Sequence, residues 1–324
     1  MTRAQPLFGD KSLPLLMTAG GGVDDLCAWA VDNRPAIAAW LNQAGVVLLR
    51  GFGISTAAGF RAACAAISPD LRNYVGGDSP RQNVHDQVYT STEYPAGSEV
   101  LLHNELSYAG WSPDRVFFGC MVAPETGGQT HVADGRQICA GLDPDVRARF
   151  AERGVTYLQH LWDGDGEPGP GKSWQETFET ADRGTVEAYL RASNMSFEWT
   201  GLGLRTAATH PAILDHPATG EACWHNQADQ WHRDIASVKD TVPGSPDAMK
   251  GGNTAGTETL GNHVTFGDGS EIEVADLMHV RQVSKACEVL FDWQPGDLMV
   301  IDNIMAMHGR KPFTGARRVL VAMA

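Results

Sequence analysis

The chain has 324 residues, of which 43% are hydrophobic, and its 39 acidic residues outnumber its 25 basic ones, for a formal charge of −14. This apolar fraction is that of a globular protein with a full core. The acidic balance argues against nucleic acid as a partner, because phosphate binding requires clustered Lys and Arg. The length predicts one or two domains. Because no run of about 18 apolar residues occurs, the sequence predicts no membrane-spanning helix.

The N-terminus has Pro and charged residues where a secretory signal would have an apolar region. The six cysteines form no CxxC pair, and a chain of this length does not need disulfides to fold. We therefore expect buried free thiols and a cytoplasmic location.

Two helices are predicted near the start of the chain. Residues 24–44 are Ala-rich, begin with acidic residues and are followed by Gly45, a pattern typical of a helix and its C-terminal stop. The apolar run 46–49 predicts a buried strand, and residues 56–68 predict the second helix. The segment 24–68 is therefore expected to be largely helical.

Beyond residue 68, short apolar or alternating runs are separated by Gly, Pro and Asp clusters, which indicates a sandwich or barrel. Residues 238–271 are rich in Gly, Thr, Asp and Asn, which is typical of a lid or a disordered loop. Residues 272–285 predict a helix laid on the core. The predicted strands are 86–92, 99–108, 115–122, 129–133, 153–158, 222–227, 287–293, 297–307 and 317–323.

The stretch LLHNELSY contains His103 and Glu105. In a strand, residues i and i+2 point to the same face, so this imidazole and this carboxylate would project together while Asn104 points the other way. The pattern alone is weak evidence, because a His and a Glu at this spacing often occur by chance.

The C-terminal residues 297–323 contain two apolar runs around a turn rich in Gly and Pro, the outline of a hairpin. His308 closes the first run, and Arg317 and Arg318 open the second, so His308 and one arginine could face one pocket. An arginine that points inward from an apolar strand needs an anionic partner. The alternative is that both arginines are solvated edge residues.

Two histidines and one carboxylate form a facial triad, the ligand set of non-haem Fe(II). Three protein ligands leave further positions free, and a nearby arginine can bind a carboxylate through two hydrogen bonds. Together these groups describe a site for iron, a 2-oxo acid and dioxygen.

Several motifs, in this order and spacing, resemble the taurine dioxygenase family of Fe(II)/2-oxoglutarate oxygenases, and more closely its clavaminate-synthase-like and asparagine-oxygenase-like branch. The resemblance covers most of the chain and implies a mainly β fold with flanking helices (α+β) around a double-stranded β-helix (jelly roll) core. It further implies a single domain, 1–324, with a lid-like insertion at about 159–285. The motifs are GVVLLRGFG, HNELSYAGWSPDRVFFGC, PETGGQTHVADGR, WHNQADQWH and FDWQPGDLMVIDNIMAMHGRKPFTGARRVLVAM.

The resemblance also implies residue roles. Arg318, with Arg317 as the alternative, matches the residue that binds the distal carboxylate of 2-oxoglutarate, and Thr130 in GGQT matches the hydroxyl that helps to hold it. The Fe(II) ligands that it implies are His103, Glu105 and His308.

For the substrate, the resemblance implies a small amino acid, an amino-acid derivative or a carrier-protein-bound aminoacyl group, used in specialised metabolite biosynthesis. Glu105 argues against halogenation, because halogenating relatives have a small residue there. Sulfonate-binding members have an arginine where Ala322 stands, so a taurine-like substrate would lack its anchor. The candidate substrate-binding residues are Asn73, Glu93, Gln227 and Trp231.

The predicted reaction is hydroxylation of an unactivated C–H bond with release of succinate and CO2, and desaturation, epoxidation or cyclisation are alternative outcomes. Two other classes stay open: a catalytically inactive jelly roll that binds a small ligand, and a zinc-dependent hydrolase. The hydrolase would leave Arg318 and Thr130 without a purpose.

Overall fold

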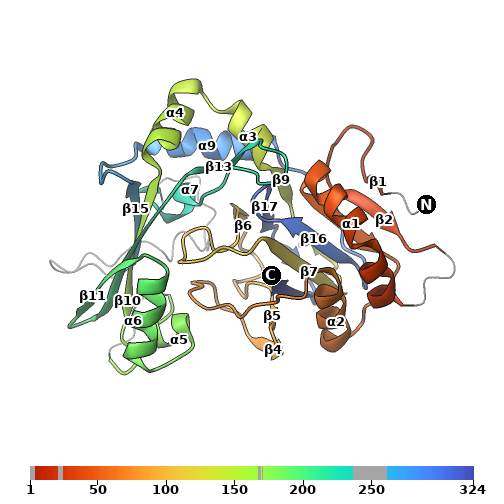
Figure 1. Cartoon of the computed structure of the whole chain (residues 1–324), viewed down its shortest axis with the longest axis horizontal. Helices are drawn as coiled ribbons and strands as arrows, with labels where there is room; N and C mark the ends of the chain where they lie inside the picture. Colours follow the sequence, from red (N-terminus) through yellow and green to blue (C-terminus); the bar gives the residue numbers. More distant parts are fainter. Residues whose placement is uncertain (1–3, 21–24, 167–168, 170, 236–260) are drawn as a thin grey trace.

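The computed structural model describes residues 4–20, 25–166, 169, 171–235 and 261–324. Two N-terminal helices lie on one side of a central pair of sheets, and a second group of strands with its own helices lies on the other side (Figure 1). Within the described residues, no helix has the length and apolar character needed to cross a membrane. All six cysteines are free thiols; four of them are buried, as predicted, whereas Cys27 and Cys287 are partly exposed.

The largest sheet has eight strands in the order β1-β2-β3-β16-β7-β19-β5-β4, antiparallel except for the pair β2–β3. Its central strands are almost entirely apolar because both faces are covered. Val47 and Leu49 pack under α1 and α2, whereas Val46 and Leu48 face the opposite core. Its strands are β1 (Gln5–Pro6), β2 (Leu15–Thr18), β3 (Val46–Arg50), β4 (Asn83–His85), β5 (Val88–Thr90), β7 (Arg115–Val122), β16 (Leu298–Asp302) and β19 (Arg318–Met323).

A three-stranded sheet in the order β6-β17-β9 packs against the inner face of the eight-stranded sheet. Leu102 and Val132 of the smaller sheet share one core with Phe118 and Ile301 of the larger one. Its strands are β6 (Val100–His103), β9 (Val132–Asp134) and β17 (Ala306–Arg310), and β8 (Thr126–Gly127) pairs with β18 (Phe313–Thr314) beside it.

A separate four-stranded sheet has the order β11-β12-β10-β15, and α5 and α6 pack on it through an apolar cluster that includes Trp174, Leu190 and Leu204. The strands are β10 (Val155–Trp162), β11 (Ser196–Thr200), β12 (Gly203–His210) and β15 (Gly261–Phe266), with the hairpin β13 (Ile213–Asp215) and β14 (Ala222–Trp224) nearby in the chain. In the part of the chain that the structure describes, the helices are α1 (Leu26–Ala44), α2 (Ala57–Ile67), α3 (Gly135–Gly141), α4 (Pro144–Arg153), α5 (Trp174–Phe178), α6 (Arg183–Ala192), α7 (Ala228–Trp231) and α9 (Val274–Ala286).

The helices predicted from the sequence are confirmed. α1 and α2 fall within the predicted ranges 24–44 and 56–68, and α9 matches the helix expected at 272–285. α1 ends at Gly45, whose backbone is left-handed (φ 73°) and whose N–H donates to the Leu41 carbonyl.

The predicted C-terminal hairpin is wrong. The run 297–307 contains two strands, because Asp302 ends β16 with a turn in which its Oδ1 accepts the N–H groups of Ile304 and Met305. β17 then pairs with β6 and β9, whereas β19 pairs with β7 and β5. His308 therefore lies in the smaller sheet, whereas Arg318 begins a strand of the larger sheet and Arg317 immediately precedes that strand.

Two loop and strand predictions also fail. Residues 261–266, expected in the loop 238–271, form β15, because they complete a full antiparallel pairing with β10. The run 287–293 contributes only an isolated bridge between Val289 and Val132. Residues 238–260 of that predicted loop lie outside the described residues.

Candidate active site

The structure brings the three predicted ligands together between the two central sheets. His103 and His308 lie opposite each other in the β6–β17 pairing, with ring centroids 4.4 Å apart. Glu105 Oε2 lies 3.4 Å from His308 Nε2, and one ligand atom of each residue lies within 4.8 Å of the others. Glu105 and His308 are buried. This cluster has the composition and spacing of a metal centre.

Glu105 reaches the site from a turn and not from a strand. β6 ends at His103, so the strand alternation that we used to pair the two side chains does not apply. Asn303 holds the turn instead: its Oδ1 accepts the Glu105 N–H at 2.7 Å and its Nδ2 donates to the Glu105 carbonyl at 3.0 Å. Asn104 does point elsewhere, and donates to the Asn303 carbonyl at 2.7 Å. A buried amide network therefore positions the carboxylate.

The hydrogen bonds of His103 fit metal binding. Its Nδ1 lies 2.8 Å from the Leu101 carbonyl, so Nδ1 carries the hydrogen and Nε2 keeps a free lone pair. Burial, with a contribution from His308, lowers the pKa of His103 to about 3, and burial also lowers the pKa of His308. Both rings are therefore neutral at neutral pH, as metal ligation requires.

Arg81 is a buried partner of Glu105 that the sequence patterns did not indicate. Its Nη2 donates to both oxygens of Glu105, at 3.0 and 2.8 Å, and its guanidinium lies 4.2 Å from the centroid of the Tyr74 ring. Burial would by itself raise the pKa of Glu105, but Arg81 and His308 outweigh it and hold that pKa well below its usual range. Arg81 therefore keeps this buried carboxyl group ionised.

We expect the substitution Arg81→Met to make metal binding depend on pH. Without the guanidinium, burial raises the pKa of Glu105, and the protonated form does not bind metal. The ratio of Mn(II) dissociation constants at about pH 5.5 and about pH 7.5 should rise once the pKa of Glu105 exceeds about 5.5, by roughly tenfold for each further pKa unit up to about 7.5. The matched control is Arg61→Met, which removes the ion pair with Asp86. An unchanged ratio in Arg81→Met would contradict the role of Arg81.

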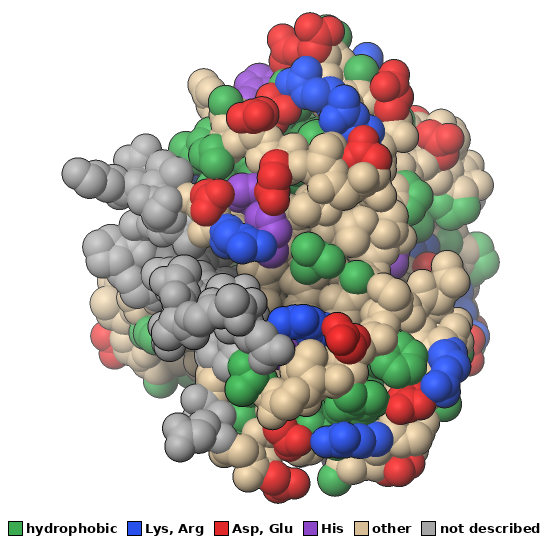
Figure 2. All heavy atoms as spheres, turned by 90° about the vertical axis from the view of Figure 1, so that its left-hand side faces the viewer, with side chains coloured by type: hydrophobic (Ala, Val, Ile, Leu, Met, Phe, Trp, Pro, Cys, Tyr) green, Lys and Arg blue, Asp and Glu red, His purple; other side chains and the backbone are tan. Residues whose placement is uncertain are grey.

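Two other clusters of possible ligands occur in the described residues, and neither suits a metal. His232, His263 and Glu271 lie together, and Figure 2, which looks onto the side that carries β15, shows histidine side chains next to acidic ones. However, Nδ1 of each histidine accepts a hydrogen bond from a backbone N–H at 3.3 Å, so the ring hydrogen lies on Nε2. In both rings Nε2 faces Glu271 and therefore presents a hydrogen, not a lone pair, to the centre of the cluster.

The second of these clusters consists of Glu99, His131 and Glu288. Lys311 forms ion pairs with both of its carboxylates, and His131 binds Glu288. The ammonium group of Lys311 therefore occupies the position that a metal ion would take. Of the three clusters, the one formed by His103, Glu105 and His308 alone presents lone pairs in the arrangement that a metal needs.

Arg318 and Arg317, the two candidates for binding 2-oxoglutarate, differ in their surroundings. Arg318 is exposed at the start of β19, where a register shift separates it from Val319 in the pairing with β7. Arg317 is half-buried, and its N–H groups donate to the Gly128 carbonyl at 3.0 Å and to Ser91 Oγ at 3.1 Å. Arg317, the alternative, is thus the arginine directed into the protein.

Arg317 has the surroundings of an anion-binding residue. It has no carboxylate partner among the residues that the structure describes, and burial together with Arg310 lowers its pKa to about 10. Arg310 differs, because both of its Nη atoms donate to main-chain carbonyls. Thr130, two residues after Gly128, is buried and accepts a hydrogen bond from Trp293 at 3.1 Å, so its own O–H can donate elsewhere. The guanidinium of Arg317 thus contacts the segment that carries the Thr130 hydroxyl, and these two kinds of donor suit a carboxylate.

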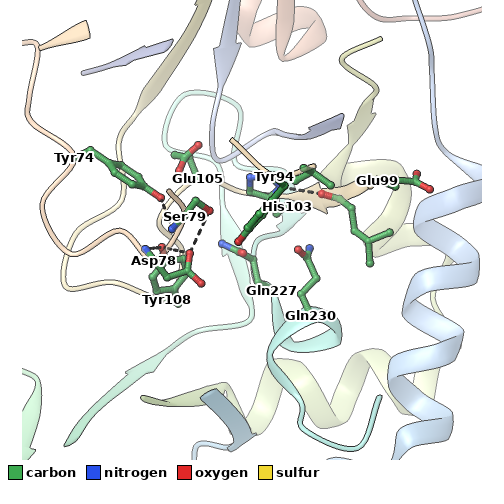
Figure 3. Close-up of a pocket in the computed structure, with 12 residues that line it drawn as sticks. Tyr74, Asp78, Ser79, Tyr94, Glu99, His103, Glu105, Tyr108, Gln227 and Gln230 are labelled. Carbon is green, nitrogen blue, oxygen red and sulfur yellow. Dashed lines mark hydrogen bonds between the residues drawn. The ribbon is translucent and has the colours of Figure 1, made fainter. Parts of the chain in front are cut away.

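A pocket lies beside His103 and Glu105, lined on one side by Gln227 and Gln230 and on the other by Asp78 and Tyr108 (Figure 3). Gln227, one of the candidate substrate-binding residues, thus lies at this pocket. Trp231 packs behind the pocket against Tyr108, with ring centroids 4.4 Å apart. The motif WHNQADQWH could have revealed Gln230, which lies three residues after Gln227 and hence one helical turn away.

Glu93 and Asn73 do not line the pocket beside His103 and Glu105. Glu93 is exposed, accepts hydrogen bonds from Gln82 and Thr90, and lines a wider cavity of about 670 Å³ that shares Asp78 and Tyr94 with the pocket. Asn73 is exposed and is not among the residues that line either space. The structure thus does not bring Asn73 to the pocket beside the metal ligands.

Gly309 allows β17 to approach its neighbours next to His308. A Cβ at this position would lie 2.2 Å from His131 Nε2 and 2.4 Å from the Val100 carbonyl oxygen. We expect Gly309→Ala to lower the free energy of unfolding by about 1–3 kcal/mol through overpacking, measured by urea denaturation. The control Gly201→Ala, where a Cβ meets nothing within 4 Å, should change it by less than about 0.5 kcal/mol. Equal effects would contradict this packing argument.

The buried triad, the inward arginine and the paired sheets together define a 2-oxoglutarate-dependent iron oxygenase. The chain belongs to the taurine catabolism dioxygenase TauD, TfdA family, whose model matches residues 9–324. It is an Fe(II)- and 2-oxoglutarate-dependent dioxygenase, with O2 as the second cosubstrate.

Two curated relatives cover most of the chain. The dapdiamide synthesis protein DdaC of Enterobacter agglomerans is 32% identical over 284 residues, which is 87% of this chain and 83% of the relative. A clavaminate synthase-like protein of Arabidopsis thaliana is 30% identical over 291 residues, 87% of this chain and 82% of the relative.

Solved structures share the fold at low identity. PvcB of Pseudomonas aeruginosa, described as an Fe, alpha-ketoglutarate dependent oxygenase from an isonitrile synthetic pathway, has a TM-score of 0.56 at 16% identity, covering 99% of this chain and 90% of that one. A taurine dioxygenase of Burkholderia xenovorans has a TM-score of 0.54 at 15% identity, covering 99% of this chain and 88% of that one.

Proposed function

We propose that this enzyme hydroxylates an unactivated C–H bond of a small amino acid or an amino-acid-derived molecule in the biosynthesis of a specialised metabolite, releasing succinate and CO2. The name of DdaC and the pathway of PvcB, both biosynthetic, support this proposal. We further propose that the two central sheets form a double-stranded β-helix (jelly roll) within a single domain, 1–324, and that the enzyme works in the cytoplasm. The free thiols support that location.

In this proposal the iron ligands are His103, Glu105 and His308. Iron bound there would supply the oxidation of the C–H bond at the expense of 2-oxoglutarate and O2. The residues of the chain orient the reactants: Arg317 and Thr130 bind the distal carboxylate of 2-oxoglutarate, and Arg81 with Asn303 fixes Glu105. Arg318, exposed, has no part in this site.

The observation that carries the proposal is the hydrogen-bond pattern of the triad, in which His103 donates from Nδ1 and Glu105 is held ionised. The test is succinate formation from 2-oxoglutarate with Fe(II), ascorbate and a panel of amino acids and amino-acid amides. We expect at least one substrate to stimulate succinate formation and to yield an equal amount of a product that is heavier by one oxygen atom. Stimulated succinate formation that persists in His308→Ala would overturn the ligand assignment.

The wider cavity supports a second form of the substrate, an aminoacyl group on a carrier protein. Its volume of about 670 Å³ is in the range of pockets for ligands larger than a free amino acid. The same assay with the aminoacyl group free and carrier-bound separates the two. The product mass also separates hydroxylation or epoxidation, which add oxygen, from desaturation or cyclisation, which remove two hydrogens. Family membership and the intact triad disfavour an inactive binding protein and a zinc hydrolase.

A further inference from the structure

Gln227 and Gln230 enter the pocket from the same helical segment. Gln227 immediately precedes α7 but makes no capping hydrogen bond with its side chain. Gln230 follows three residues later, so both side chains lie on one face of the helix. Their side chains are only 3% and 7% exposed. Figure 3 shows both amide groups reaching towards His103.

The main chain fixes the orientation of both amides. Gln227 Nε2 donates to the Asn104 carbonyl at 2.8 Å and to Ser107 Oγ at 3.1 Å, and Gln230 Nε2 donates to the Leu102 carbonyl at 2.8 Å. An amide nitrogen that donates to a carbonyl turns its own oxygen away from it. The bonded residues lie next to His103 and Glu105 in the chain. The two side-chain oxygens are therefore held in place beside the metal ligands.

Among the residues that the structure describes, none donates a hydrogen bond to the side-chain oxygen of Gln227 or of Gln230. Across the pocket, Asp78 Oδ1 accepts a hydrogen bond from the hydroxyl of Tyr108 and adds a carboxylate to the opposite wall. Arg81 is already bound to Glu105. The pocket thus presents acceptors, and a ligand with N–H donors would satisfy groups that are costly to leave unpaired.

We propose that Gln227 and Gln230 bind an N–H-bearing group of the substrate, a primary amide or an ammonium group, and so set the substrate class of the enzyme. This inference rests on the proposed function, because it concerns the pocket beside the proposed iron ligands. The two glutamines act as acceptors: their oxygens bind the donor group while their nitrogens stay on the main chain.

The test uses four probes with a common four-carbon carboxylate: L-asparagine, with an ammonium and an amide group; succinamate, with the amide only; L-2-aminobutyrate, with the ammonium only; and butyrate, with neither. Binding is measured anaerobically by calorimetry on the full chain loaded with Fe(II) and 2-oxoglutarate. We expect the N–H-bearing probes to bind more tightly than butyrate, and the comparison of succinamate with L-2-aminobutyrate identifies the group that is bound.

The variants Gln227→Met and Gln230→Met keep side-chain length and remove the acceptor. Each should weaken binding of the preferred probe by roughly three- to tenfold and leave butyrate binding unchanged. Gln137→Met, on the exposed surface of α3, is the matched control. Butyrate binding as tightly as the other probes, no saturable binding of any N–H-bearing probe, or unchanged binding in both variants would overturn the inference.

A separate reading of the visible charge-transfer band before probe addition reports on the proposed function. If that band is missing, the proposed iron and 2-oxoglutarate site has failed, and the same calorimetry on metal-free protein still tests the acceptor pair. If the band is present and normal in both variants, a loss of probe binding belongs to the glutamines and not to a damaged metal site.

Discussion

Arg317→Ala should raise the dissociation constant for 2-oxoglutarate by at least about 30-fold, because truncation of one partner of a desolvated charge pair commonly costs about 2–5 kcal/mol. The guanidinium lies in the protein without a carboxylate partner among the described residues. Its removal forfeits the hydrogen bonds to Gly128 and Ser91 but also relieves a half-buried charge without a counter-ion, so the free energy of unfolding should fall by no more than about 1–2 kcal/mol. The measurement is anaerobic titration of the Fe(II)-loaded protein with 2-oxoglutarate.

The control for this prediction is Arg318→Ala. Arg318 is exposed and lies next in the chain, so its loss should leave 2-oxoglutarate binding unchanged. If Arg318→Ala weakened binding and Arg317→Ala did not, the proposed role of Arg317 would be wrong and Arg318, the first choice from the sequence, would take its place.

His308→Ala should weaken Fe(II) binding by at least about 100-fold, because even the loss of residues that only support a metal ligand commonly costs 10- to 100-fold. His308 lies opposite His103 and 3.4 Å from Glu105. Both of these neighbours are themselves ligands in our assignment, so neither can replace His308. The measurement is metal content after anaerobic loading and desalting, with unfolding by urea as a check that the variant folds.

His232→Ala is the informative partner variant, because it removes a histidine from the cluster in which the ring hydrogens face Glu271. Its metal content should equal that of the wild type. A loss of bound metal in His232→Ala would show a second metal site and contradict our assignment of the ring hydrogens.

Local patterns predicted much of the fold because they depend on neighbours in the chain. The helices α1, α2 and α9 and the buried strand β3 follow from periodicity and from the stop at Gly45. The hairpin prediction failed because strand pairing is non-local: the turn at Asp302 sends β17 to the smaller sheet, although its apolar residues continue those of β16. Residues 261–266 form a strand only because β10 is available to pair with them.

In the candidate site, too, some features follow from the sequence and others depend on non-local contacts. Motif order predicted His103, Glu105 and His308, which the structure brings together, although Glu105 comes from a turn held by Asn303. Motif spacing could not decide between Arg317 and Arg318, because the register shift at the start of β19 sets their directions.

Some residues of the site carry no local signal. Arg81 arrives from a loop and becomes meaningful only through its contact with Glu105, which is 24 residues away in the chain. Asp78 and Tyr108 meet in the same way across 30 residues. Such contacts between distant segments determine the chemistry of the pocket and cannot be read from the spacing of motifs.

The central claim is that His103, Glu105 and His308 hold iron beside an arginine that binds 2-oxoglutarate. The most direct test is anaerobic titration of the metal-free protein with Fe(II) in the presence of 2-oxoglutarate. Our account predicts a weak visible charge-transfer band that requires both components, saturates at one iron per chain and is absent in His308→Ala. Iron uptake without the band, or a band of equal strength in His308→Ala, would contradict it.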